Sequence, residues 1–335
     1  MYYLGVDVGS VSTNIVVMDN ERNVLDKLYL RTKGRPIQVI QEGLKILGRK
    51  FEDKDIRAVG TTGSGRTISA FLIGADVIKN EITAHAVAAV NMDRNVRTVI
   101  EIGGQDSKII VIKNGIATDF AMNTVCAAGT GSFLDRQAER LEIPIEDFGE
   151  YSLRSKIPVR IAGRCAVFAE SDMIHKQQLG YDVSDIICGL CHAMVRNYLN
   201  NVAKGKEILP NIFFQGGVAA NIGIKKAFEK ELGYELIVPA HYDVMGAVGA
   251  AMLAKRIVNK NNVGTKFKGF KTAENRIETR SFECDMCSNR CEVATLFDGK
   301  KLIGSFGDKC GRWNTQELKL NIIMNKKFEK SAFRS

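Results

Sequence analysis

Short apolar strands and one amphipathic helix alternate over the first 60 residues. Apolar residues that alternate or cluster between tight turns predict strands at Tyr2–Asp7, Thr13–Asp19 and Val24–Arg31. Apolar spacings of three and four residues then predict a helix over Pro36–Arg49, and Ile56–Gly60 returns to the strand pattern. This alternation is typical of an α/β protein.

A similar series of elements begins again near residue 96. Val96–Ile102 and Ser107–Ile112 predict a hairpin-like pair of strands, with Gly115–Phe120 as a third. Tyr3–Ser10 resembles Val99–Ser107, since each is an apolar strand that runs into a glycine turn. This weak repeat predicts a pseudo-duplicated fold with a cleft between its halves. Further helices are expected at Thr130–Leu141, Cys165–Gln178, Val183–Ala203, Gly223–Glu231 and Met245–Ile257.

The sequence changes character after the last of these helices. Asn259–Arg280 is rich in Lys, Asn, Gly and Thr and lacks apolar periodicity, so we expect a linker. Thr295–Phe297 and Leu302–Phe306 flank the turn Asp298-Gly299 and predict a hairpin. We therefore divide the chain into lobe I (1–92 and 240–257), lobe II (93–239), a linker (258–281) and a cysteine-rich segment (282–335).

The composition indicates a protein with a sizeable core. The chain has 335 residues, of which 45% are hydrophobic, and only five prolines. Met1–Gly9 has a strand pattern instead of that of a secretory leader, and the apolar runs are too short to cross a bilayer. We therefore expect a cytoplasmic protein without a membrane partner. In that compartment its eight cysteines are more commonly ligands, catalytic groups or core residues than disulfides.

The net charge of +9 is concentrated in the C-terminal part of the chain. From Arg256 onward there are 17 Lys and Arg against 9 Asp and Glu, so this part carries +8 and the preceding residues about +1. Basic residues are not interleaved with aromatic ones, and there is no nucleic-acid motif, so no nucleic-acid partner is expected. The basic tail is either a solvated face or a docking surface for an acidic protein.

Candidate phosphate-binding chemistry lies in the turn after the first strand. The segment Asp7-Val-Gly9-Ser10-Val-Ser12-Thr13 combines glycine with hydroxyl side chains. Glycine allows close approach of the backbone to a phosphate, to whose oxygens backbone N–H groups and hydroxyls can donate. The carboxylate of Asp7 can hold Mg²⁺, generally through water. The alternative is an ordinary Gly/Ser hairpin turn.

The second half of the repeat has the same design at the equivalent position. In Glu101-Ile-Gly103-Gly104-Gln105-Asp106, Gln105 can orient an attacking water, and Asp106 can bind Mg²⁺ or act as a base. We therefore expect Asp7, Gln105 and Asp106 to be catalytic, and Gly103 and Gly104 to contact the nucleotide.

Two further glycine motifs follow in order. In Gln215-Gly216-Gly217-Val-Ala-Ala-Asn221, a strand ends in paired glycines and opens a helix, where a flat ring or a ribose can lie against the backbone. The run that begins at Gly246 is a helix of small residues suited to close packing, which needs no ligand to explain it.

The ordered set of four motifs resembles the actin, sugar-kinase and Hsp70 ATPase superfamily. That resemblance implies a duplicated two-lobed fold with ATP or ADP and Mg²⁺ in the cleft. There is no Walker A sequence, so a P-loop NTPase is disfavoured. The nucleotide-binding residues that we expect are Gly9, Ser10, Ser12, Thr13, Gly103, Gly104, Gly129, Thr130, Gly131, Gln215, Gly216, Gly217, Asn221 and Gly246.

Two cysteines each precede a predicted helix. Cys126 begins Cys-Ala-Ala-Gly-Thr-Gly-Ser-Phe, and Arg164-Cys165 begins the next helix. A helix N-terminus lowers the pKa of a thiol and stabilises an anionic thiolate–cluster assembly. Two thiolates supply half of the four ligands that a [4Fe–4S] cluster normally takes, so a two-fold dimer would complete the set. The alternative is two buried free cysteines.

These cysteine segments resemble the signatures of the 2-hydroxyacyl-CoA dehydratase activators, a group that includes the ATPase subunits of benzoyl-CoA reductase. The resemblance covers roughly residues 1–255. It implies a homodimer with one bridging [4Fe–4S] cluster on Cys126 and Cys165. It also implies ATP-driven one-electron transfer, with ferredoxin or flavodoxin as donor and an iron–sulfur dehydratase or reductase as acceptor.

The remaining cysteines fall into two groups. Cys188 and Cys191 form a CxxC inside a predicted helix whose apolar face they share, so we expect them in the core. In the tail, a second metal site of zinc or an iron–sulfur cluster would stabilise a segment with little core of its own; the alternative is four free thiols. Its candidate ligands are Cys284, Cys287, Cys291 and Cys310. This segment resembles the region after the activator module in larger fused activases, whose reductase-like module is here either a separate subunit or a continuation of the chain.

Two other functions compete with this interpretation. A small-molecule kinase of the same superfamily, for example for an amino sugar, would explain the cleft but leave Cys126 and Cys165 without a role. A non-catalytic regulator that binds ATP and metal would dock through its basic tail. The sequence leaves the acceptor enzyme, the electron donor and the metal of the tail open.

Overall fold

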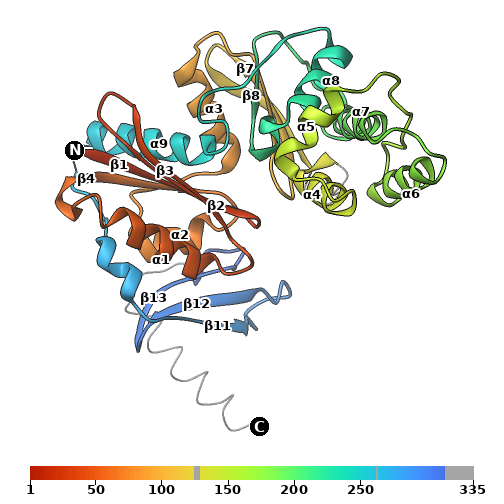
Figure 1. The fold of residues 1–335 in the computed structure, drawn as a ribbon. Coiled ribbons are helices and arrows are strands. Elements are labelled where there is room, and N and C mark those ends of the chain that lie inside the picture. Colours follow the sequence, from red (N-terminus) through yellow and green to blue (C-terminus); the bar gives the residue numbers. More distant parts are fainter. Residues whose placement is uncertain (124–128, 262, 314–335) are drawn as a thin grey trace, which may run out of the picture.

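A computed structural model describes residues 1–123, 129–261 and 263–313 of the chain. Two α/β lobes lie side by side, and a small C-terminal sheet packs under the first (Figure 1). Among the described helices, none is long and apolar enough to cross a bilayer.

Lobe I is built on a five-stranded mixed sheet. Its strands are β1 (Tyr2–Val8), β2 (Ser12–Met18), β3 (Val24–Arg31), β4 (Ile56–Thr62) and β5 (Val77–Ile78). Their order is β3-β2-β1-β4-β5, in which β1, β2 and β3 are antiparallel and β1, β4 and β5 are parallel. The three N-terminal strands predicted from the apolar pattern are confirmed.

Helices cover both faces of this sheet. On one face lie α1 (Pro36–Leu47) and α2 (Arg66–Ile73), and on the other α3 (Glu81–Met92) and α9 (Met245–Asn261) (Figure 1). A single-turn helix, η1 (Asp53–Asp55), precedes β4.

Lobe II repeats the sheet of lobe I. Its strands are β6 (Thr98–Ile102), β7 (Ser107–Lys113), β8 (Ile116–Asn123), β9 (Ile212–Gln215) and β10 (Leu236–Ile237). The order β10-β9-β6-β7-β8 again places three antiparallel strands beside two parallel ones. The duplicated fold expected from the sequence is therefore confirmed. The helices of this lobe are α4 (Gly131–Arg140), α5 (Ile145–Leu153), α6 (Ala166–Gln178), α7 (Val183–Asn201), η3 (Gly217–Ala220) and α8 (Ile222–Leu232).

Small residues allow α9 to lie unusually close to β1, β4 and α3. A Cβ added to Gly5 would lie 1.9 Å from the carbonyl oxygen of Ala247, and one added to Gly60 would lie 2.1 Å from that of Ala250. A Cβ on Gly249 would lie 1.9 Å from the carbonyl oxygen of Ala84. The close packing expected of this helix is confirmed, and the Cβ-free contacts bring the start of α9 against the cleft.

The segment predicted as a linker packs against lobe I instead. Phe270 begins the helix η4 (Phe270–Glu274), is only 7% exposed and joins the core of lobe I. Its backbone N–H donates to Asp53 Oδ1 at 2.7 Å, and Thr265 donates to Asp76. The sequence lacks periodicity here because single apolar residues and side-chain hydrogen bonds, not an amphipathic helix, hold the segment.

The C-terminal sheet contains β11 (Ile277–Glu283), β12 (Glu292–Asp298) and β13 (Lys301–Phe306), all antiparallel. The predicted hairpin is confirmed as β12 and β13, with Gly299 at a φ of 58° in its turn. A Cβ on Gly304 would lie 2.4 Å from Phe71 of α2, so this sheet also rests on lobe I (Figure 1).

Candidate functional site

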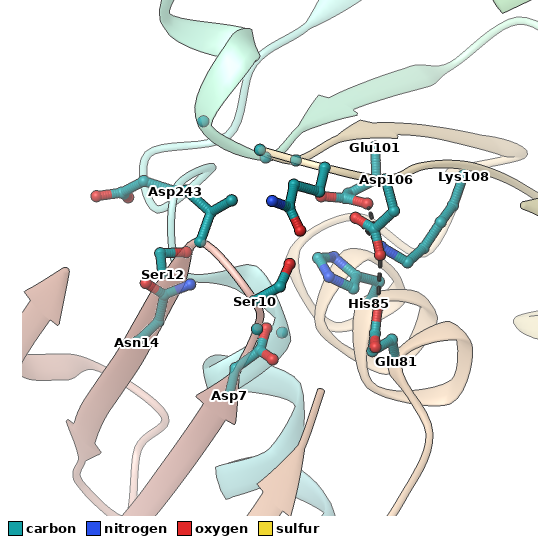
Figure 2. A pocket seen from close by; sticks show the side chains of 18 of the residues that line it. Asp7, Ser10, Ser12, Asn14, Glu81, His85, Glu101, Asp106, Lys108 and Asp243 are labelled. Carbon is teal, nitrogen blue, oxygen red and sulfur yellow. Dashed lines mark hydrogen bonds and ion pairs between the residues drawn. The ribbon is translucent and has the colours of Figure 1, made fainter. Parts of the chain in front are cut away.

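A cavity of about 270 Å³ lies between the lobes. It brings together residues of the segments Asp7–Thr13 and Glu101–Asp106, which we call the first and the second phosphate loop. Asp7, Ser10 and Ser12 enter it from lobe I, and Asp106 enters it from lobe II (Figure 2). Gln105 of lobe II also lines the cavity. The fold explains why both sets of side chains face the cavity, because each set lies at the turn between the first two antiparallel strands of its sheet.

Asp7 lies at the end of β1 against the start of α9. A Cβ on Gly246 would lie 2.0 Å from Asp7 Oδ2 and 3.2 Å from His85 Nε2, so glycine leaves the room that both side chains occupy. Burial raises the pKa of Asp7 to about 7, against the opposing effect of nearby His85. A divalent cation would favour the charged form of this carboxylate, and oxygen ligands of this kind suit Mg²⁺.

The first phosphate loop presents alternate side chains of β2 to the cleft. The backbone N–H of Gly9 donates to the carbonyl of Ser12 at 2.8 Å and closes the turn. Ser12 and Asn14 line the cavity, whereas Thr13 between them is fully buried, with its hydroxyl 3.0 Å from that of Thr32. The strand period of two therefore turns Thr13 away from the cavity and brings in Asn14, which the motif had not singled out.

The second phosphate loop is closed in the same way. The N–H of Gly103 donates to the carbonyl of Asp106 at 2.9 Å. Burial, and then the charge of Glu101, raise the pKa of the Asp106 carboxyl. Gln105 lines the cavity beside it. The geometry allows the water-orienting and metal- or proton-binding roles expected of Gln105 and Asp106, which remain predictions.

A buried lysine, which sequence reasoning missed, joins the carboxylates of this site. Lys108 is 2% exposed, and its Nζ lies 2.9 Å from Glu81, 2.8 Å from Glu101 and 3.0 Å from Asp106 (Figure 2). These carboxylates raise the pKa of Lys108 well above its usual value although burial opposes them. One ammonium faces three carboxylates, so the cleft retains negative charge that a divalent cation would offset. The available signal was a lysine directly before the apolar run Ile109–Ile112 of the strand that follows Gln105-Asp106.

The motif Gln215–Asn221, where a flat ring or a ribose is expected, lies beside a second cavity of about 400 Å³ that shares Gly103 and Gly104 with the first. Gly217 and Asn221 line it. Gly216 has a φ of 85°, and a Cβ there would lie 2.3 Å from the carbonyl oxygen of Ile102. Gly216 itself lines the first cavity, and glycine there permits the ends of β6 and β9 to approach each other closely.

Three other residues of the expected nucleotide set, Gln215, Gly129 and Thr130, are not among the residues that line the two cavities. Gln215 is fully buried, with Oε1 2.9 Å from His85 Nδ1 of lobe I, so it joins the lobes. Thr130 is also fully buried. Gly131 lines the second cavity, and its N–H donates to the carbonyl of Gly103 at 2.8 Å. A Cβ on Gly129 would lie 3.0 Å from Asn197 Oδ1. We assign no direct contact with nucleotide to Gln215, Gly129 or Thr130.

Cys165 is the residue immediately before α6, and it is partly exposed. The helix stands at the outer end of lobe II (Figure 1). Next to Cys165, the apolar side chains of Val167 and Phe168 are 68% and 65% exposed. A thiol at a helix N-terminus with apolar neighbours suits an iron–sulfur cluster at an interface between subunits. Cys126 lies outside the described residues.

The CxxC pair belongs to α7, as predicted. Cys191 is buried in the core of lobe II, and burial raises its pKa to about 12. Cys188 is half-buried, and burial raises its pKa as well. Neither thiol is suited to form a thiolate.

The tail cysteines do not form a common ligand set in the described part of the chain, where no three His, Cys, Asp or Glu side chains meet as a metal site. Cys284 packs under the C-terminal sheet and accepts a hydrogen bond from Trp313 Nε1 at 3.3 Å. Cys291 is partly exposed, and Cys287 and Cys310 are exposed. Cys284 thus serves as an apolar core residue of the small sheet, and the second metal site on the four tail cysteines remains a prediction.

The fold and the cleft define a class: a two-lobed ATPase with the fold of actin and the sugar kinases. Within this class the protein belongs to the BadF/BadG/BcrA/BcrD ATPase family, whose sequence pattern matches residues 4–254.

Individual relatives agree with this assignment. The chain is 37% identical to the (R)-2-hydroxyglutaryl-CoA dehydratase activating ATPase of Acidaminococcus fermentans over 258 residues, which are 76% of this chain and 97% of that protein. The crystal structure of component A of that dehydratase superposes with a TM-score of 0.71 at 35% identity and covers 77% of this chain and 99% of its own. The activator of 2-hydroxyisocaproyl-CoA dehydratase from Clostridium difficile, solved with bound ADPNP, gives a TM-score of 0.72 at 32% identity and covers 78% and 97%.

Proposed function

We propose that this protein is an ATP-dependent activator that delivers single electrons at low potential to a 2-hydroxyacyl-CoA dehydratase or a related iron–sulfur enzyme. Its relatives named above activate such dehydratases, and one of them was solved with an ATP analogue. The observation that carries the proposal is the partly exposed Cys165 at the start of α6, in a chain whose two phosphate loops face one cavity.

The cleft residues divide the work of binding and hydrolysing ATP. Gly9, Ser10 and Ser12 supply donors for phosphate oxygens, and Asp7 holds Mg²⁺ through water. Gln105 orients the attacking water, and Asp106 accepts its proton or assists Asp7 at the metal.

The second cavity takes the adenosine. Gly217 and Asn221 line it, and Gly103 and Gly104 connect it with the phosphate site. The backbone of Gly217 would contact the base, because the absence of a Cβ atom leaves room for a flat ring.

Cys165, together with Cys126, would hold one half of a [4Fe–4S] cluster at the two-fold axis of a homodimer. Bound there, the cluster supplies one-electron chemistry. The exposed side chains of Val167 and Phe168 become buried between the subunits, and the amide groups at the start of α6 stabilise the negative charge of the thiolates. A ferredoxin or flavodoxin serves as the electron donor.

The replacements Cys126→Ser and Cys165→Ser test this assignment. After anaerobic purification we expect about four iron atoms per wild-type dimer and an EPR spectrum of the reduced protein that differs between ADP and ATP. Each variant should lose the visible absorbance of the cluster. The affinity of Cys165→Ser for ATP should stay within about twofold of wild type, since Cys165 is not among the residues that line the cavity.

Cys188→Ser is the matched control, because this half-buried thiol belongs to α7 and should leave the iron content unchanged. Retention of the cluster in both test variants would reject the assignment. A colourless monomer that phosphorylates an amino sugar would favour the kinase alternative, and an iron-containing dimer without ATP-dependent electron transfer would favour a regulator.

A further inference from the structure

Two adjacent side chains on α7 contact the backbone beside the second phosphate loop and the backbone before Cys165. Tyr198 is fully buried, and its hydroxyl donates to the carbonyl of Lys108 at 2.7 Å. Asn197 is 2% exposed, and its Nδ2 donates to the carbonyl of Gly163 at 2.7 Å and also to that of Arg164. One turn of helix thus touches both candidate sites.

The segment before Cys165 depends on α7 for much of its hydrogen bonding. Residues 158–165 have no regular secondary structure. Arg196 donates to the carbonyl of Ile161 at 2.8 Å, and the N–H of Val159 donates to the carbonyl of Asp185 at 3.2 Å. A Cβ on Gly163 would lie 2.8 Å from the carbonyl oxygen of Ala193, so the segment lies directly on the helix. A shift of α7 would therefore move this segment with it.

Two series of contacts connect α7 with the nucleotide cleft. Tyr198 bonds to the backbone of Lys108, whose ammonium holds Asp106 at 3.0 Å in the cleft. Asn197 Oδ1 is buried without a hydrogen-bond partner among the described residues and faces Gly129, just before α4. The first residue of α4, Gly131, donates to the carbonyl of Gly103.

We propose that Asn197 and Tyr198 are positioning residues that couple occupancy of the nucleotide cleft to the placement of Cys165. Tyr198 follows movement of the second phosphate loop, and Asn197 transmits it to the backbone of Gly163 and Arg164. Packed elements of this kind change by discrete shifts, which suits a switch between two nucleotide states. The inference rests on the proposed function for the redox role of Cys165, but the mechanical coupling can be measured without a cluster.

The first test is hydrogen–deuterium exchange over residues 158–165, measured in cluster-free protein with ADP and with ADPNP. We expect the two nucleotides to give different exchange rates in wild type and the difference to shrink about fivefold or more in Tyr198→Phe and Asn197→Ala. Tyr198→Phe removes one hydroxyl and keeps the ring, so it remains informative if Asn197→Ala fails to fold. Tyr151→Phe and Asn201→Ala are matched controls on α5 and α7 outside this path.

The second test uses the reconstituted dimer. Iron content and nucleotide affinity should stay near wild type in both variants, while the EPR difference between ADP and ATP diminishes and electrons delivered per ATP fall about fivefold or more. Wild-type exchange differences and wild-type EPR differences in both variants would overturn the inference. A wild-type protein that binds no cluster would instead reject the proposed function, and the exchange experiment would still decide whether α7 couples the two regions.

Discussion

At the residue scale, the electrostatics of the cleft depend on charged side chains that are partly or fully withdrawn from bulk water. Among the described residues, Asp7 forms no ion pair that would compensate its burial, whereas Asp106 shares Lys108 with Glu81 and Glu101. A bound Mg²⁺ would supply the missing compensation for Asp7. The nucleotide-free protein should therefore carry a charge at Asp7 that costs stability at neutral and alkaline pH.

Asp7→Asn should reveal this cost. The pKa of Asp7 is raised from 3.8 to about 7 in the folded protein, so its contribution to stability is fully present below pH 3.8 and is lost as the pH rises through 7. Asn cannot ionise. In nucleotide-free protein at pH 8.5, the free energy of unfolding of the variant should therefore exceed that of wild type by on the order of 1–3 kcal/mol, with little difference near pH 4. Urea unfolding at both pH values measures this.

The same variant should bind Mg·ATP at least about tenfold more weakly, because the amide cannot replace the anionic carboxylate near the metal. Ser64→Ala, which also alters the lining of the cleft but removes no charge, is the control for stability. Equal stability of Asp7→Asn and wild type at pH 8.5 would show that Asp7 is well solvated.

At the element scale, the helix α9 and the segment after it fasten lobe I. Glycine and alanine bring α9 against β1 and β4, and Phe270 then closes the opposite face beside α1. A Cβ on Gly48 would lie 2.7 Å from Phe270, which shows how tightly that ring is enclosed. The segment that follows the ATPase core is thus packed as part of lobe I.

Phe270→Ala tests this attachment. Loss of the buried ring should lower the free energy of unfolding by about 2–4 kcal/mol, measured by urea unfolding. Lys271→Ala, at the exposed neighbouring position of η4, should change it by less than about 0.5 kcal/mol. If the two variants are equally stable, the segment behaves as the linker that its composition predicts.

At the scale of the whole molecule, the nucleotide cleft and Cys165 lie on different surfaces. The cavity lies between the lobes, whereas α6 projects from the outer end of lobe II (Figure 1). Exposed apolar side chains at the start of α6 are costly in an isolated chain and indicate contact with a partner, for which a second copy is our proposal. Activity would then depend on assembly as well as on nucleotide.

Phe168→Asp should weaken that assembly. A charge placed in an apolar contact between copies should raise the dissociation constant of the dimer about tenfold or more, measured by anaerobic sedimentation velocity over a range of concentrations. Phe120→Asp replaces an aromatic residue of similar exposure on β8 and should not change dimerisation. Undiminished dimerisation of Phe168→Asp would place the interface elsewhere.

Local patterns in the sequence were sufficient to predict the repeat, the order of the motifs and the position of Cys165 before a helix. Strand alternation and turn glycines act over a few residues, so β1, β2, β6 and β7 could be predicted directly. The family signatures around Cys165 likewise lie in one short stretch.

Only the tertiary structure decided which side chains meet. The ammonium of Lys108 lies close to the carboxylate of Glu81 because α3 packs beside β7. Gln215 contacts His85 of the other lobe, which is 130 positions away in the sequence. Thr13 and Asn14 differ in role because packing of the sheet decides which face of β2 borders the cavity. The sequence determined the elements because their periodicity is local, whereas the buried ion pairs, the attachment of Phe270 and the contacts of α7 depend on how distant elements pack.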